Sequence, residues 1–507
     1  MASETKRENT VQHIPPLSDG GPLGRGLTHR QAMWGTRLLL AYFGLRLLFL
    51  ALNISSFVPP DEVTHAGICK VFSRTLLFPE NGPDTYEFGL VTTIPWLYYW
   101  SMGKVLHLNF FGLTDLVFLR IINIPLAFGT IFFARRTLRL VSDSLLTQLL
   151  LTAVLTNCAM FTLLSASVSY DNLTNLCAAM SIYYLFASFK EQSGQLLAAS
   201  ILCQLAGCLT KITFLPLVPV LALLLIFQGK KSLHLLPSSL SKHVQTMALR
   251  SWLLTGAILI LLALNINLYG RNYLNYGQLL PSMEQVISSK AAMNYRLSAR
   301  SIIFNQYRED KISYMDALLL TGEITHPGDK SDTFYLLMNY EKLKRNPQLW
   351  MGPFEYGTVW LKTVYATILG IKAHLPMYKE TNFLVPYYIL SLVALAGFML
   401  RWRPRQSGWL PVGLAAVVLP YAGYLMYAIN YTNYLNYGVP GITLQGRYLF
   451  PLIVPLSILF CHYLLLFFRT EVLRLTLALL TIVLFIAGDF PWFLLHTTPQ
   501  WYQWMPH

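Results

Sequence analysis

Long apolar runs separated by short polar connections occupy most of this chain. A helix that crosses the hydrocarbon core of a bilayer needs about 17 to 25 mainly apolar residues, and about eleven runs are near that length. They cover residues 33–54, 115–134, 145–166, 172–189, 194–210, 212–228, 251–269, 383–400, 408–429, 448–468 and 473–490. The pattern predicts an all-α, polytopic membrane protein with about eleven transmembrane helices.

The connections between these runs differ greatly in length. The first, 55–114, contains an aromatic stretch at 94–106 that is too short to cross a bilayer and is predicted to be an interfacial helix. A later connection is long enough to form a small helical subdomain. We therefore expect five regions: a polar N-terminus (1–32), an N-terminal transmembrane module (33–270), a large loop (271–382), a C-terminal transmembrane module (383–490) and a tail (491–507).

The composition agrees with this class, because 54% of the 507 residues are hydrophobic and only 12% are charged. The net charge of +14 comes largely from basic residues on alternate connections: Lys6, Arg7, Arg25, Arg30, Arg37, Arg135, Arg136, Arg139, Lys190, Lys230, Lys231, Lys242, Arg250, Arg401, Arg403, Arg405, Arg469 and Arg474. The positive-inside rule makes this side the cytoplasm. The N-terminus is then cytoplasmic, and the first loop, the large loop and the tail lie outside. With no basic helix, we expect no nucleic-acid partner.

Other short signals add little. The six cysteines show no CxxC spacing, so neither a disulfide framework nor a zinc site is expected. The polar first 30 residues lack an early apolar segment, so no cleaved signal peptide is expected. Glycosylation sequons at Asn53 and Asn172 leave a eukaryotic lumenal protein open, but both lie too near the membrane to be informative, and a bacterial inner membrane is favoured.

The stretch after the first apolar run holds the first candidate chemistry. Pro59 and Pro60 end the preceding helix, and Asp61 can cap a new helix that begins near Glu62. Asp61 and His65 then share one helix face. A carboxylate there can act as a general base, or bind a divalent metal with His65 as a further ligand. The alternative is a capped helix start with a solvated charge pair.

Two further candidates follow at junctions on the same external side. Asp171 lies at the start of the run 172–189, where it can serve a site or simply cap the helix. Lys211 separates two apolar runs, where its ammonium can neutralise a phosphate or extend along the interface toward water.

The fourth candidate is the segment Gln445, Gly446, Arg447 and Tyr448 at the external mouth of the run 448–468. A guanidinium suits bidentate binding of phosphate, although a lone arginine at a helix end can also be an interfacial anchor. Gly446 lets the backbone approach a ligand closely. Two acidic and two basic centres are thus expected on one side of the bilayer, which favours a shared site.

These motifs, in this order, resemble those of the GT-C superfamily of glycosyltransferases, which use polyprenyl-phosphate sugars. The resemblance spans about residues 35–465 and is greatest to a large, mostly uncharacterised bacterial branch of that clan. It implies that Asp61, Glu62 and Asp171 are catalytic residues, with Asp61 as the catalytic base or a metal-associated carboxylate and Asp171 as a second acidic residue of the site. It further implies that Arg447 and Lys211 face the lipid phosphate, with His65, Gln445 and Tyr448 near the substrate.

The reaction implied is inverting transfer of a sugar from the lipid carrier to a glycan, lipid or protein acceptor outside the cell. Val63 and Thr64 stand where related chains carry small residues or proline, and no large soluble C-terminal domain follows, which leaves acceptor recognition to the large loop. A flippase for a lipid-linked saccharide is the main alternative, and a non-enzymatic assembly subunit is another. Apart from Arg46, Arg120 and Asp489, the runs contain almost no interior charge, which disfavours a transport path.

Overall fold

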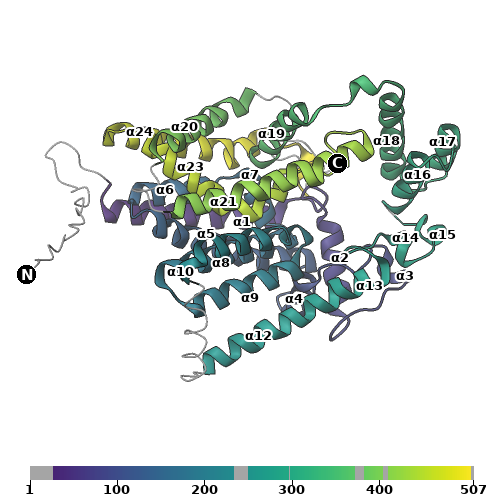
Figure 1. Cartoon of the computed structure of the whole chain (residues 1–507), viewed down its shortest axis with the longest axis horizontal. Coiled ribbons are helices and arrows are strands. Elements are labelled where there is room, and N and C mark those ends of the chain that lie inside the picture. Colours follow the sequence, from purple (N-terminus) through teal and green to yellow (C-terminus); the bar gives the residue numbers. More distant parts are fainter. Residues whose placement is uncertain (1–26, 233–248, 296, 371–381, 403–408, 504–507) are drawn as a thin grey trace, which may run out of the picture.

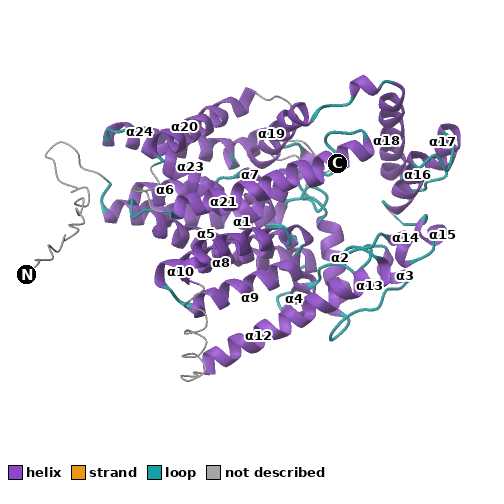
Figure 2. Ribbon diagram, viewed as in Figure 1, coloured by secondary structure: helices purple, strands orange, loops and turns teal. Residues whose placement is uncertain are grey.

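A computed structural model describes residues 27–232, 249–295, 297–370, 382–402 and 409–503. The described residues form helices joined by loops, with no strand among them, which confirms the all-α prediction (Figure 2). The residues outside these ranges include most of the predicted polar N-terminus, part of the large loop, and the basic residues Lys6, Arg7, Arg25, Lys242, Arg403 and Arg405.

Each predicted apolar run falls on helix. The helices are α1 (His29–Asn53), α5 (Asp115–Val141), α6 (Leu145–Thr156), α7 (Ala159–Ser165), α8 (Tyr170–Glu191), α9 (Gly194–Thr210), α10 (Leu217–Ser232), α12 (Leu249–Asn265), α20 (Val385–Arg401), α21 (Leu410–Gly423), α23 (Ile453–Phe467) and α24 (Glu471–Gly488). In the described residues, six helical segments are long and apolar enough to cross a membrane, or seven when the bent pair α6 and α7 is counted as one span. This supports a multi-pass membrane protein, whereas the number eleven stays a prediction.

Two breaks and the short helices beside them account for part of this difference. Helices α6 and α7 meet at 65°, α9 and the segment 212–228 are both short, and the 3-10 turn η2 (Ile212–Phe214) separates them. Two other spans continue through π-helical turns, η3 (Ile266–Gly270) into α13 (Arg271–Tyr276) and η6 (Tyr424–Tyr431) into α22 (Thr432–Tyr437).

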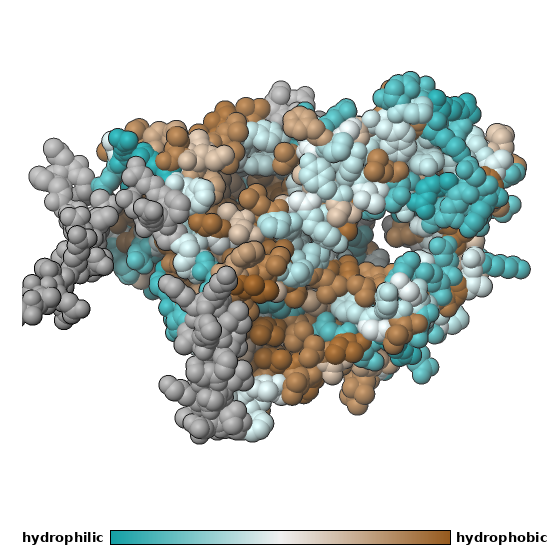
Figure 3. Space-filling model, in the orientation of Figure 1, coloured by the Kyte–Doolittle hydropathy of each residue, from teal (hydrophilic) through white to brown (hydrophobic). Residues whose placement is uncertain are grey.

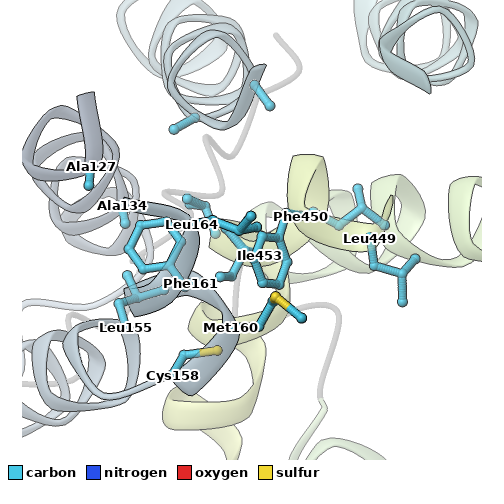
Figure 4. Close-up of a cluster of buried hydrophobic side chains, with 14 of the residues drawn as sticks. Ala127, Ala134, Leu155, Cys158, Met160, Phe161, Leu164, Leu449, Phe450 and Ile453 are labelled. Carbon is cyan, nitrogen blue, oxygen red and sulfur yellow. The ribbon is translucent and has the colours of Figure 1, made fainter. Parts of the chain in front are cut away.

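The bundle is held by a large apolar core. Figure 4 shows its centre, where Phe161 of α7 meets Phe450 of the 3-10 helix η7 (Gly446–Leu452), with ring centroids 6.2 Å apart. Ala127 and Ala134 leave room on α5 for these large rings. By contrast, only 11% of the most apolar 18-residue stretch of the segment Ser251–Tyr276 is buried. Within this segment, α12 packs mainly against α9 (Figure 1). Such an apolar, uncovered helix is what a lipid-facing position requires.

Both long connections are helical. The first contains α2 (Glu62–Ser73), α3 (Pro83–Tyr86), α4 (Leu97–Val105) and the turn η1 (Leu106–Leu108). The predicted interfacial stretch is therefore a helix, and its Tyr98 and Tyr99 are buried, with α4 packed against α2. The large loop contains α14 (Met283–Val286), α15 (Ser289–Ala292), α16 (Ser298–Arg308), α17 (Tyr314–Gly322), α18 (Pro327–Arg345), η4 (Pro347–Leu349) and α19 (Pro353–Leu369).

The large loop divides into two parts. Helices α16, α17 and α18 enclose their own small core around Phe304 and Leu337, at one end of the molecule, where the surface is hydrophilic (Figure 3). Helix α19 instead packs on η7 and α7 within the bundle. The remaining short helices are η5 (Asn382–Leu384), which precedes α20, and α25 (Phe490–His496) and η8 (Pro499–Trp501), which follow α24.

Candidate active site

Asp61 stands at the turn that starts α2, in an uncommon backbone conformation. Its φ is 58° and its ψ is 14°, the left-handed region that a non-glycine residue adopts only at a cost of about 1 to 3 kcal/mol. Its side chain makes no capping hydrogen bond, so the predicted side-chain cap is wrong. The side chain of Asp61 is instead 49% exposed, and its carboxylate accepts a hydrogen bond from Arg447 at 2.6 Å.

Asp61 belongs to a group of four charged residues that we call the ionic cluster: Asp61, Asp171, Lys211 and Arg447. Lys211 Nζ lies 2.5 Å from Asp171 Oδ1, and Arg447 Nη1 lies 3.7 Å from Asp171 Oδ2. All but Asp61 are buried. The two carboxylates and two cations balance in formal charge, so the cluster can remain ionised inside the protein. The structure thus brings together four predicted residues that are separated by up to 386 positions along the chain.

Local sequence places each member of the cluster. Asp171 is in the first turn of α8, and the N-cap of that helix is Ser169. The alternative that Asp171 caps the helix is therefore wrong. Lys211 ends α9 and is only 4% exposed, so it does not extend to water. Arg447 lies in η7, and its side chain is 2% exposed, which is not the position of an interfacial anchor.

Aromatic rings line the cluster. Lys211 Nζ lies 4.6 Å from the ring centre of Tyr170 and 4.9 Å from that of Tyr448, and an ammonium over such rings is stabilised by their electron-rich faces. The His65 ring packs edge-on against Tyr170, with centroids 4.4 Å apart. Tyr448 was predicted, and Tyr170 could have been found as the neighbour of Asp171.

His65 is held as a neutral ring facing the cluster. Its Nδ1 is 2.8 Å from the hydroxyl of Tyr99, while its buried Nε2 has no hydrogen-bond partner among the described residues. Burial lowers the pKa of His65 to about 4, because the buried charged ring loses its hydration, and the nearby Asp61 only partly opposes this effect. No sequence signal pointed to Tyr99, since it comes from an aromatic stretch with no distinctive spacing.

Two other buried polar atoms in the same region lack a partner within the described part of the chain. They are the Nε of Arg447 and the Oε1 of Gln445. A buried polar group without a partner costs about 1 to 3 kcal/mol, and such groups are rare unless a ligand or water completes them. Together with His65 Nε2, these atoms mark a site with unused hydrogen-bonding capacity.

Glu62, by contrast, points into the bundle. Arg120 donates to both of its carboxylate oxygens, at 2.8 and 2.5 Å, and the backbone N–H of Val168 donates to Oε1 at 2.8 Å. Arg120 also donates to the carbonyl of Ile54 at 2.7 Å. Both side chains are 0% exposed. This geometry supports a positioning role for Glu62, and its predicted catalytic role has no observation behind it.

An apolar cavity of about 300 Å³ lies beside η7. It is lined by Val154, Cys158, Trp360, Leu361, Val364, Tyr365, Ile368, Leu369, Tyr387, Ser391, Ala422, Leu449, Phe450, Ile453, Leu456, Ser457, Phe460 and Phe485. Side chains three residues apart nearly eclipse one another in a 3-10 helix. Arg447 of the cluster and Phe450 of the cavity wall therefore lie along one side of the same short helix.

The residues near Asp61 do not form a complete metal site. No group of three or more His, Cys, Asp and Glu side chains able to hold a metal ion occurs in the described residues. Both oxygens of Asp171 face cations, and Asp61 is paired with Arg447. Among the described residues, therefore, no third protein ligand joins the predicted metal pair of Asp61 and His65.

No protein-family model matches this chain, and no curated protein is significantly similar to it.

Proposed function

We propose that this protein is a membrane glycosyltransferase that moves a sugar from a polyprenyl-phosphate carrier to an acceptor hydroxyl, with inversion. The observation that carries the proposal is Asp61: a half-exposed carboxylate, held in a left-handed turn, against a buried arginine. A bacterial inner membrane with the ionic cluster on the external side is part of the proposal, as are a glycan, lipid or protein acceptor and no nucleic acid.

The donor phosphate would bind Arg447 and Lys211. A phosphate oxygen competes with Asp61 for the guanidinium, and Arg447 keeps its second carboxylate neighbour, Asp171, at 3.7 Å. Donor binding therefore loosens Asp61 from its ion pair and leaves it able to accept a proton. The prenyl chain would extend toward the apolar cavity beside η7, where Leu449 and Phe450 line the wall.

The chemical step is a single displacement. The acceptor oxygen forms a bond to the anomeric carbon as the bond from that carbon to the phosphate oxygen breaks. The bonding electrons leave with the phosphate, whose added charge Arg447 and Lys211 stabilise, and the acceptor proton passes to Asp61. Attack opposite the leaving group inverts the anomeric centre. Neutral His65 offers Nε2 to a sugar hydroxyl.

The test compares two carboxylates of similar exposure, each of which is paired with a cation. Asp115 is 46% exposed and lies 3.2 Å from Lys70, close to the 49% exposure of Asp61. Purified protein in nanodiscs is given a panel of radiolabelled undecaprenyl-phosphate hexoses and pentoses, with cell-envelope extract as the acceptor source. We expect Asp61→Asn to slow transfer at least about 100-fold, and Asp115→Asn to leave it unchanged. Undiminished transfer by Asp61→Asn, or no transfer by the wild type from any donor, contradicts the proposal.

A second measurement separates donor binding from chemistry. Arg447→Ala should weaken binding of undecaprenyl phosphate about tenfold or more, while Asp61→Asn binds it at least as well as the wild type. Equal binding by Arg447→Ala and wild type refutes the phosphate role. A flippase would instead move an intact lipid-linked saccharide across a liposome bilayer without releasing the carrier.

A further inference from the structure

A second cavity, which is polar, lies at the other end of α1 and α5, far from the ionic cluster. Its volume is about 290 Å³, and it is lined by His29, Ala32, Met33, Thr36, Arg37, Leu40, Arg135, Arg139, Leu145 and Gln148. Arg120 and Arg135 are both on α5, and fifteen residues of helix span about 22 Å. The cavity therefore belongs to neither the ionic cluster nor the apolar cavity beside η7.

The lining of this cavity is basic. It contains three arginines from two helices, Arg37, Arg135 and Arg139, and its lining residues include no carboxylate. Arg139 Nε donates to Gln148 Oε1 at 3.2 Å, whereas the buried Nε of Arg135 has no partner among the described residues. Converging guanidinium groups without a carboxylate repel one another, and an anion between them would remove that repulsion.

Two helix starts add to the positive potential. The first turn of α1, which contains His29 and Ala32, lines the cavity, as does the first turn of α6, which contains Leu145 and Gln148. The backbone N–H groups of a first turn have no partner inside the helix, and the helix dipole places partial positive charge there. Thr28 caps α1 and Ser144 caps α6, so one N–H of each first turn is already satisfied, and the two helix starts add the partial positive charge of the helix dipole to that of the arginines.

The positive-inside rule alone accounts for arginines at this end of the bundle. It does not account for a cavity that three of them line together, nor for the buried Nε of Arg135, which has no partner among the described residues. The adjacent Arg136 shows the difference, because its guanidinium carbon lies 5.1 Å from the ring centre of Phe132 and the residue lines no part of this cavity.

We propose that the cavity between α1, α5 and α6 binds a phosphate ester. Arg37, Arg135 and Arg139 supply the charge-assisted hydrogen bonds, and residues of the two helix starts line the same cavity. The apolar Met33, Leu40 and Leu145 provide a surface for the ester's carbon skeleton. Either an anionic lipid headgroup or a soluble phosphate ester offers this chemistry.

The experiment uses the full chain, delipidated in detergent, with three probes: dioleoyl phosphatidylglycerol, glycerol 3-phosphate and zwitterionic dioleoyl phosphatidylcholine. Binding is followed by native mass spectrometry for the lipids and by thermal shift for the soluble ester. We expect the anionic lipid, the soluble ester or both to bind better than phosphatidylcholine, and the better probe identifies the source. The proposal is overturned when neither the anionic lipid nor the soluble ester binds better than phosphatidylcholine.

Variants locate the binding. Arg135→Gln and Arg37→Gln should each weaken the anionic probe about tenfold, whereas Arg136→Gln should leave its affinity unchanged. Arg37 is exposed, so its variant tests the proposal even where Arg135→Gln fails to fold. An unchanged affinity in Arg37→Gln, or an equal loss in Arg136→Gln, overturns the assignment to this cavity.

Discussion

Asp61 and Glu62 are neighbours in sequence but have opposite surroundings. Glu62 is fully buried, and Arg120 and the Val168 N–H fill its oxygens. Asp61 is half exposed and shares Arg447 with Asp171. Because Asp61 adopts a left-handed backbone conformation, the Glu62 carboxylate lies inside the bundle while the Asp61 carboxylate remains half exposed.

We call the ion pair of Glu62 and Arg120 a closed pair and the ionic cluster an open cluster, because they differ in how many of their buried hydrogen-bonding groups lack a partner. Around Glu62 and Arg120, nearly every hydrogen-bonding group is satisfied, including the carbonyls of Ala51 and Ile54 at the end of α1. Near the ionic cluster, His65 Nε2 and Arg447 Nε have no partner among the described residues. A closed pair fixes the first loop to the bundle, whereas an open cluster can exchange partners when a ligand arrives.

Arg46 and Asp489 form a second buried ion pair, between α1 and the end of α24, although the buried Nε of Arg46 has no hydrogen-bond partner among the described residues. Their atoms are 2.5 Å apart, Thr162 donates to Asp489 at 2.9 Å, and Arg46 also contacts the Thr156 carbonyl. The three interior charges noted in the sequence are therefore all in ion pairs, Arg120 with Glu62 and Arg46 with Asp489. Each of these ion pairs joins helices that are far apart in the sequence.

The largest expected effect is on the closed pair. Glu62→Gln leaves Arg120 buried without a counter-charge, which should lower the free energy of unfolding by about 3–5 kcal/mol. Asp61→Asn should lower it by less than about 1 kcal/mol, because the site is half solvated. Thermal unfolding of the purified variants in detergent measures both. Replacing both partners, Glu62→Met with Arg120→Met, should recover part of the loss, and equal losses for Glu62→Gln and Asp61→Asn would remove the distinction.

Lys211→Met should have an intermediate effect. It removes one cation from a cluster of four, while Arg447 remains 3.7 Å from Asp171, so we expect a loss of about 1–3 kcal/mol in stability. It should also weaken undecaprenyl-phosphate binding. Thermal unfolding and carrier binding measure the two effects, and Lys70→Met, on the exposed pair with Asp115, is the control that should change neither. A Lys211→Met variant as unstable as Glu62→Gln would show that the cluster is closed as well.

Gly446→Ala tests how Arg447 is positioned. A Cβ at this residue would lie 2.7 Å from the Val364 carbonyl and 2.8 Å from Thr367 Oγ1, which also accepts a hydrogen bond from the Gly446 N–H. Helix η7 would have to move away from α19, at about 1–3 kcal/mol. Carrier binding should fall with stability. Gly441→Ala is the control, because a Cβ at this residue would have no neighbouring atom within 4 Å. Unchanged stability and carrier binding in Gly446→Ala would show that η7 does not depend on this contact.

The sequence was informative about the cluster because charged residues are conspicuous between apolar runs. Asp171, Lys211 and Arg447 each lie next to one end of such a run. The alternation of basic connections predicted that the three residues are on the same side of the membrane. It was uninformative about which of Asp61 and Glu62 turns inward, because that depends on a single backbone dihedral and on Arg120 from α5. Nor could apolar length reveal that α6 and α7 bend by 65°, or that α19 packs into the bundle.

The smallest expected effect concerns His65 and pH. The folded pKa is about 4, below the usual 6.5, so the unfolded chain takes up the proton first as the pH falls. The stability that comes from the neutral ring is complete above about pH 6.5 and decreases as the pH falls toward 4, by less than about 1 kcal/mol between pH 7 and 6. Thermal unfolding at both pH values should show this decrease in the wild type and a smaller one in His65→Gln, which keeps a polar side chain near Tyr99. The open cluster would then be slightly acid-sensitive, whereas an identical decrease in His65→Gln would assign the pH dependence to another group.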